Sequence, residues 1–528
     1  MKRRNPVRWL AAPGVLLLAV ASVGRAEAHG FGQRYTLPVP LWLYLYGSAA
    51  VVVLSFVLVG FFVGEEKVPG GYRRYNLLGV HWLRTLLPHP ALLLTLRLLS
   101  VGLFALVVIS GTLGDQAPSL NFAPTFVWVI WWVGLGAVTA LVGNLWVLLN
   151  PWKTLFDWAD AAARRMALGG LELHAPYPRW LGVWPALLLY FGFVWLEIIF
   201  AGAPRPSNIA LFALAYSVIT WTGMVYFGRD VWLRQGEAFS VFFGILARFA
   251  PTEVRVTDSG ACTAGDAPCH IEPDGCVNCY ECFEFAEPAK RELNLRPWAV
   301  GLVRGEAITA DRLAFVLFML ASVTVDGLQV TSAWLHVEAL AFPATQAVGR
   351  WGYPMLQTLG LLVVPVLFGV IYYGFAELMR RASGREQRVH TIAAGFIYSL
   401  VPIALAYQIA HYYTLLLIQG QSIIPLLSDP FGWGWNLFGT AGYSVNAAVL
   451  GAAFVWYSQV ALIVAGHVIA VYLAHVLALR LLRNPRRALH SQYPLLALMV
   501  LYTVSSLWIL SQPIIEETNR AGLLLYLR

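Results

Sequence analysis

Charged side chains are scarce in this chain. They make up 12% of the 528 residues, whereas a soluble globular domain carries about 25%. Apolar residues make up 59%, and a water-soluble protein of this composition would expose large apolar patches. The sequence also lacks a G-x-S-x-G elbow, a phosphate loop and the zinc motifs H-E-x-x-H and H-x-H. These absences exclude the common serine hydrolases, nucleotide hydrolases and zinc proteases, and they favour a membrane protein.

The first 28 residues are typical of a secretory signal peptide. A basic start at residues 2–8 precedes an apolar run at 9–23, and Ala26-Glu27-Ala28 has the pattern of a cleavage site. Cleavage there makes His29 the first residue of the mature chain. The alternative is an uncleaved first helix, because Arg25 lies close to the cut.

Ten apolar segments follow, each long enough to cross about 30 Å of hydrocarbon. Trp and Tyr gather where these segments meet loops, as residues at a membrane interface do. We therefore expect an all-α fold, a polytopic bundle of about ten transmembrane helices in two groups of five, 29–228 and 310–512. The predicted spans are 40–63, 91–113, 125–149, 181–202, 209–228, 310–330, 353–379, 392–418, 455–481 and 493–512.

Lys and Arg fall almost entirely in every second loop. The loops 64–90, 150–180, 229–312, 380–391 and 480–492 hold 25 of these residues, and the remaining loops and ends of the mature chain hold five. The positive-inside rule makes the first set cytoplasmic, so the mature N-terminus and the tail at 513–528 are external. The same bias explains the net charge of +8 without a nucleic-acid partner.

Three stretches are expected to lie at the membrane surface rather than to span it. Asn150 and Pro151 are a good N-cap and first helical residue, and Trp152, Leu155 and Phe156 follow on one apolar face. Residues 72–87 and 230–250 are similarly amphipathic.

Ionisable residues inside the predicted helices are the first candidate site, because burying them in a bilayer costs several kcal/mol. Glu197, Asp326, His411 and His467 all lie in the outer half of the predicted topology. Imidazoles and a carboxylate suit a divalent metal with an open position, whose bound water becomes a nucleophile near neutral pH. The alternative is that each His only hydrogen-bonds a neighbouring helix.

The mature N-terminus is a second candidate. The free amine and imidazole of His29 would chelate copper, a metal that imidazole nitrogen suits. His336, in an external loop with Glu338 close by, is a further candidate ligand. A residue exposed at the N-terminus by chance is the alternative.

All five cysteines lie in the predicted cytoplasmic segment 229–309, between residues 262 and 282. Their spacing is C-x6-C-x6-C-x2-C-x2-C, and His270 directly follows Cys269. Cytoplasmic thiols stay reduced, so disulfides are not expected. Cys276, Cys279 and Cys282 with Cys262 or Cys269 predict a structural zinc site. An iron–sulfur cluster is the less favoured reading, because the usual following C-P is missing; five unligated cysteines are the remaining alternative.

Similarity to a known family runs along most of the mature chain. It is carried by the stretches HGFGQRYTLPVPLWLYLYG (29–47), GNLWVLLNPWKTL (143–155), FGRDVWLRQGEAFSVFFGILARFAP (227–251), HYYTLLLIQGQSIIPLLSDPFGWGWNLFGTAGY (411–443) and WYSQVALIVAGHVIAVYLAHVLALR (456–480). They resemble bacterial integral membrane proteins of the fenitrothion hydrolase family. The resemblance implies the inner membrane of a bacterium and hydrolysis of organophosphate triesters, and it supplies no catalytic residue set. It does not extend to the Cys-rich insert.

Three functions remain open on the sequence. The first is a metal-dependent membrane hydrolase of small apolar phosphotriesters, centred on Asp326, His411 and His467. The second is an ion, proton or metal transporter that uses the same residues. The third is a redox membrane protein with haem-ligating histidines and a cluster on the cysteines.

Overall fold

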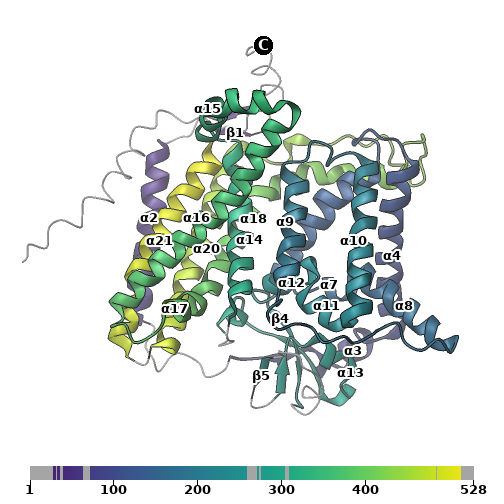
Figure 1. Ribbon diagram of the computed structural model, residues 1–528, viewed down its shortest axis with the longest axis horizontal. Helices are drawn as coiled ribbons and strands as arrows, with labels where there is room; N and C mark the ends of the chain where they lie inside the picture. The colour runs from purple at the N-terminus through teal and green to yellow at the C-terminus, as the bar shows by residue number, and fades with distance from the viewer. Residues whose placement is uncertain are drawn as a thin grey trace, which may run out of the picture.

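The computed structural model of this chain is predominantly helical (Figure 1). It describes residues 28–30, 33–35, 40–62, 72–258, 270–272, 275–303, 308–482 and 484–512. The predicted signal peptide up to residue 27 and the predicted external tail at 513–528 lie outside these residues.

Most of the helices fall into two groups, which precede and follow residues 247–309 in the sequence. The first group is α2 (Leu41–Phe62), α3 (His81–Leu86), α4 (Pro90–Leu113), α5 (Phe122–Pro124), η4 (Thr125–Leu135), α6 (Gly136–Leu141), α7 (Trp146–Leu149), α8 (Pro151–Arg165), α9 (Trp184–Ile198), α10 (Pro206–Phe227), α11 (Arg229–Gln235) and α12 (Ala238–Leu246). The second group is α14 (Ala310–Gln329), α15 (Ser332–Val348), α16 (Gly352–Ala382), α17 (Val389–Phe396), η9 (Ile397–Leu400), α18 (Val401–Ile418), η10 (Gln419–Ser422), α19 (Ile423–Ser428), α20 (Ala452–Leu481) and α21 (Pro485–Ser511).

Eight helical stretches of the described chain are long and apolar enough to cross a bilayer. They correspond to eight of the ten predicted spans. The other two predicted spans, 181–202 and 310–330, form α9 and α14. Helix α9 has 15 residues, which is about 22 Å at 1.5 Å per residue. Helix α14 is buried on nearly all sides by α9, α16, α18 and α21, as expected of a helix at the centre of a bundle.

The third predicted span is not a regular α-helix. Between α5 and α6 the whole of η4 is wound as a π-helix. A π-helical stretch is rare and is frequently found at functional sites. The eighth span is also interrupted, because the 3₁₀ turn η9 separates α17 from α18.

A five-stranded antiparallel sheet, missed by the sequence analysis, lies at one end of the bundle (Figure 1). Its strand order is β3-β7-β4-β6-β5. The strands are β3 (Tyr75–Asn76), β4 (Thr252–Val256), β5 (His270–Glu272), β6 (Gly275–Val277) and β7 (Arg291–Leu295), and the short helix α13 (Tyr280–Phe285) follows β6. A separate hairpin pairs β1 (Ala28–Gly30) with β2 (Gln33–Tyr35).

A buried ion pair holds the sheet together under the helices. Glu253 on β4 accepts from Arg296 at 2.7 Å and Arg74 at 2.6 Å, and also from the Tyr72 hydroxyl at 2.6 Å. The side chains of Glu253 and Arg296 are both fully buried. Burial lowers the pKa of Arg296, and the contact with Glu253 opposes that effect.

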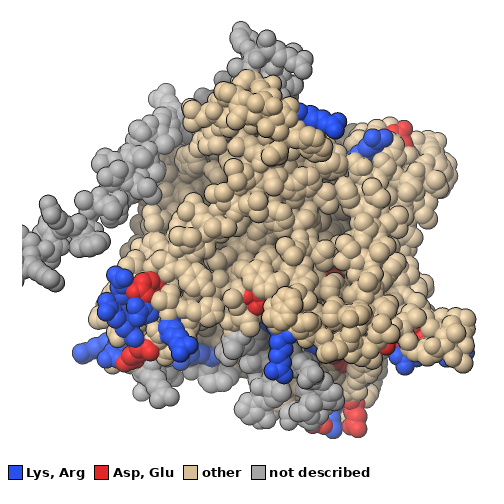
Figure 2. Space-filling view, viewed as in Figure 1, with Lys and Arg blue, Asp and Glu red and all other residues tan. Residues whose placement is uncertain are grey.

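The helix predicted to begin at Asn150 and Pro151 is confirmed as α8. The Asn150 side chain accepts from the Lys153 amide, and Pro151 is in the first turn. Trp152 and Phe156 are buried and Leu155 is half-buried. Figure 2 shows Lys and Arg gathered mainly at the end of the bundle that carries the sheet, a few at the opposite end, and an almost uncharged band between. This pattern fits a bilayer around the band.

Candidate functional site

Three of the four predicted intramembrane residues lie close together, on α9, α14 and α18. Glu197 precedes the last residue of α9, Asp326 lies three residues before the end of α14, and His411 lies in the second half of α18. The structure therefore brings together one residue from the N-terminal group of helices and two from the C-terminal group.

Asp326 is the centre of this cluster. Its Oδ2 atom lies 2.9 Å from His411 Nε2 and accepts a hydrogen bond of 2.6 Å from the Tyr412 hydroxyl. Glu197 lies close enough to interact electrostatically with both Asp326 and Tyr412. Hydrogen bonds to an ionised carboxylate are shorter and stronger than neutral ones. The Asp326 and His411 side chains keep 26% and 21% of their exposure, so the cluster is partly accessible.

A glycine beside Asp326 allows the helices to approach. A Cβ atom on Gly327 would lie 2.6 Å from the Tyr407 hydroxyl and 2.7 Å from Ile509. Only a residue without a side chain fits there. Gly327 therefore lets α18 and α21 pack directly against the turn of α14 that carries Asp326.

His467, the fourth predicted residue, does not join this cluster. It is fully buried in α20, and its Nδ1 atom lies 2.8 Å from the Ile463 carbonyl. A carbonyl only accepts, so Nδ1 carries the proton and Nε2 is an acceptor. Nε2 has no hydrogen-bond partner among the described residues. Its ring packs against Tyr502, at 6.0 Å between centroids.

The predicted metal site of Asp326, His411 and His467 is therefore not formed as expected. Among the described residues, no group of three His, Cys, Asp or Glu side chains is arranged to hold a metal ion. The physical reason is that His467 turns its protonated nitrogen onto its own helix, and α20 presents it to α21 rather than to α14.

A row of polar rings leads away from the cluster. The Tyr407 ring lies 6.1 Å from the His411 ring and 6.5 Å from the Tyr502 ring, which lies 6.0 Å from the His467 ring. The Tyr502 hydroxyl bonds Thr324 at 2.7 Å, and the buried Tyr407 hydroxyl has no hydrogen-bond partner among the described residues. This row from His411 past Tyr407 and Tyr502 to His467 is called the polar track below.

Sequence reasoning placed Tyr407 on the helical face of His411 but missed Tyr412 and Tyr502. Tyr412 follows His411 directly, and neighbouring residues in a helix point in directions about 100° apart. Both nevertheless reach Asp326, because the carboxylate lies between those two directions. Tyr502 carries no spacing signal at all.

The second candidate, the N-terminal copper site, is only partly covered by the described residues. His29 pairs with Arg34 across the β1–β2 hairpin, and its side chain lies outside the described part. His336 is exposed on α15, with Nδ1 2.6 Å from the Ser332 carbonyl. Glu338 accepts from Tyr353 at 2.7 Å.

The third candidate, the cysteine segment, lies in the sheet. Cys276 is in β6, and Cys279 and Cys282 lie at the start of α13. The three pack in one small apolar cluster, with 2.9 Å between the Cys279 and Cys282 sulfurs. Cys276 and Cys279 are each disulfide-bonded, which differs from the reduced thiols expected of a cytoplasmic loop. Cys262, Cys269 and the His270 side chain lie outside the described residues.

Comparison with known proteins adds no family. No protein-family model matches the chain, and no match is found among curated proteins or solved structures. The resemblance to the fenitrothion hydrolase family therefore stays a prediction from the sequence.

Proposed function

We propose that this protein moves protons across the membrane, and that Asp326, His411 and Glu197 bind and release the transported proton. The observation that carries the proposal is a carboxylate inside a helical bundle that shares one oxygen between an imidazole and a phenol. Ionisable groups inside membrane helices mark ion pathways and proton relays. The cluster also joins the two helical groups, where transporters place their binding sites.

The donor set favours a proton over a metal ion. One oxygen of Asp326 is already occupied by two hydrogen-bond donors, and the nearby groups are imidazole, phenol and a second carboxylate. Each of these exchanges protons. A hard cation would instead need six or more oxygen ligands, many of them carbonyls.

The buried polar track supports a route away from the cluster. It includes two buried polar atoms without a partner among the described residues, the Tyr407 hydroxyl and His467 Nε2. His475 lies two turns beyond His467 on α20 and contacts Gln492 at 3.1 Å. Eight residues of helix correspond to about 12 Å, so this route leads toward the end that carries the sheet.

The proposed orientation follows the positive-inside rule. The sheet end, with its Lys and Arg, would face the cytoplasm, and the cluster would open on the external side of a bacterial cytoplasmic membrane. The mature N-terminus would then be external.

Proteoliposomes that contain a pH-sensitive dye test the proposal. An imposed membrane potential should drive proton entry in the wild-type protein, and Asp326→Asn should lower the rate at least ~tenfold, because a required proton-transfer group contributes on the order of 10²–10⁴. The control is Glu338→Gln, since Glu338 is a half-buried carboxylate on α15 that bonds Tyr353 and takes no part in the cluster. Equal fluxes in Asp326→Asn and wild type would reject the proposal.

Phosphotriester hydrolysis is the second candidate, because an apolar cavity adjoins the turn of α9 that carries Glu197. His411, oriented by Asp326, would act as the general base toward a water molecule. The test is release of the aryl alcohol from an aryl phosphotriester by the same proteoliposomes. His411→Gln should abolish that release if this reading is correct.

A further inference from the structure

A large cavity lies between α4, η4, α6, α9 and α10. Its volume is about 950 Å³, at the upper end of the range for small-molecule sites. Leu141, Leu188 and Ile219 line it and are 49%, 70% and 45% exposed. These residues lie in apolar helices, so the cavity opens sideways, through the surface that the bilayer covers.

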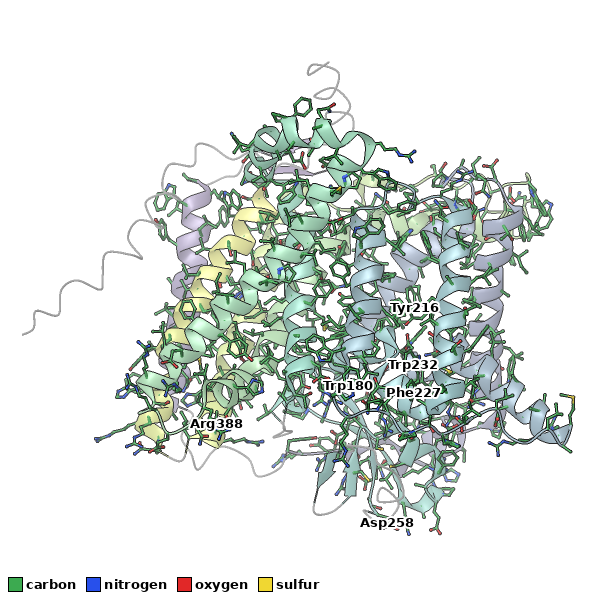
Figure 3. All side chains as sticks on the ribbon, viewed as in Figure 1. Trp180, Tyr216, Phe227, Trp232, Asp258 and Arg388 are labelled. Atoms are coloured by element: carbon green, nitrogen blue, oxygen red, sulfur yellow. The ribbon has the colours of Figure 1, made fainter. Side chains whose placement is uncertain are left out.

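Most polar side chains of the wall turn their hydrogen bonds into the protein. Trp152 donates to Ser217 at 2.7 Å and Trp195 donates to Thr358 at 2.8 Å. Six of the seven lining side chains with a polar atom are bonded in this way, Trp131 being the seventh: Ser100, Trp128, Trp146, Trp152, Trp195 and Tyr216. Figure 3 shows Tyr216 at mid-height in the bundle, above Trp232 and Phe227. Such a wall offers water few hydrogen-bond partners, so the cavity favours a hydrocarbon.

The length of the cavity and the side on which it opens favour a lipid tail. Lining residues on α10 run from Ile209 to Ile219, about 15 Å along the helix axis at 1.5 Å per residue. An extended hydrocarbon chain fits this length, and the bilayer that covers the opening supplies such chains.

The π-helix and two glycines form part of the wall. Much of η4, from Phe126 to Leu135, lines the cavity. Gly134 and Gly192 face it from opposite sides, and a Cβ atom on Gly192 would meet nothing within 4 Å. The position of Gly192 is therefore open space within the wall.

We propose that this cavity is a specific binding site for the hydrocarbon tail of a bilayer lipid, which enters sideways from the membrane. The proposal does not depend on proton transport, because it rests on the wall of the cavity alone.

The test is the lipid content of the purified protein. The full chain is extracted in mild detergent, and bound lipid is counted by native mass spectrometry and identified after extraction. The wild type should retain about one lipid per chain, and Gly192→Phe should lose most of it, because the new ring fills the cavity. The matched control is Gly369→Phe on α16, where a Cβ also meets nothing within 4 Å and which does not line the cavity.

Gly192→Leu is a milder variant that guards against misfolding, and it should retain less lipid than wild type while remaining monodisperse. Lipid loss in the two Gly192 variants but not in Gly369→Phe supports the site, whichever headgroup the lipid carries. Equal retention in all variants overturns it. Wild-type protein without tightly bound lipid, or with a copurifying polypeptide that Gly192→Phe displaces, overturns it as well.

Discussion

The hydrogen bond between Tyr412 and Asp326 can be measured by a double-mutant cycle. Tyr412→Phe removes one oxygen and leaves the ring in place, and Asp326→Ala removes the acceptor. Hydrogen bonds to charged groups contribute about 1.5–3 kcal/mol. The short 2.6 Å distance favours the upper part of that range. Because the Asp326 side chain is 26% exposed, water can replace part of the lost hydrogen bond. We therefore expect a coupling energy of about 2 kcal/mol.

The free energy of unfolding is measured by denaturant titration in mild detergent for the wild type, the two single variants and the double variant. The coupling energy is the difference between the effect of the double variant and the sum of the two single effects. Independent sites are additive within about 0.5 kcal/mol. Additivity of Tyr412→Phe and Asp326→Ala would refute the cluster, since its geometry requires them to be coupled. The control pair is Tyr353→Phe with Glu338→Ala, which share an exposed 2.7 Å hydrogen bond between α16 and α15. Exposed pairs contribute about 0–1 kcal/mol, so their coupling should be smaller.

Four other results follow from the structure. Glu253→Ala should destabilise the sheet by about 3–5 kcal/mol, because Arg296 is left buried without a counter-charge, and hydrogen exchange at β4 and β7 should accelerate far less in Glu253→Gln. If the reduced cysteine segment holds zinc, Cys276→Ser should lose about one metal ion per chain by elemental analysis, and an unchanged metal content would remove the zinc site. A reporter fused after Gly384 should be active only in its cytoplasmic form, and periplasmic activity would reverse the proposed orientation. His467→Phe should reduce proton flux at least ~tenfold and leave any phosphotriester hydrolysis at Asp326 intact, and the opposite pattern would favour the hydrolase.

Hydropathy predicted the helices well because the bilayer imposes a simple rule on every spanning segment. Eight predicted spans became long apolar helices, and the cap at Asn150 was confirmed from local residues. The π-helix of η4 could not be predicted, because its winding depends on the packing of neighbouring helices rather than on its own residues. The sheet was missed for a related reason. Its strands are two to five residues long, too short for a clear alternation of polar and apolar residues.

The candidate site likewise has a part that the sequence predicts and a part that only packing decides. The cost of burying an ionisable group predicts that Asp326 and His411 find polar partners, and they find each other. The same argument does not say which neighbour a buried residue chooses. His467 satisfies one nitrogen on the Ile463 carbonyl of its own helix, so the cost of burial is reduced without any contact to Asp326. Only the packing of α20 against α21 decides that outcome.

Helix α9 connects the cavity to the ionisable cluster. Trp195 and Leu196 line the cavity, and Glu197 is the next residue. Successive residues of a helix are rotated by about 100°, so any rotation of α9 that moves Leu196 also moves Glu197 relative to Asp326. A lipid tail packed against Leu196 would restrain that rotation, and an empty cavity would permit it. Through this one turn of α9, lipid binding would therefore change the distance between Glu197 and Asp326 and with it the charge state of the cluster.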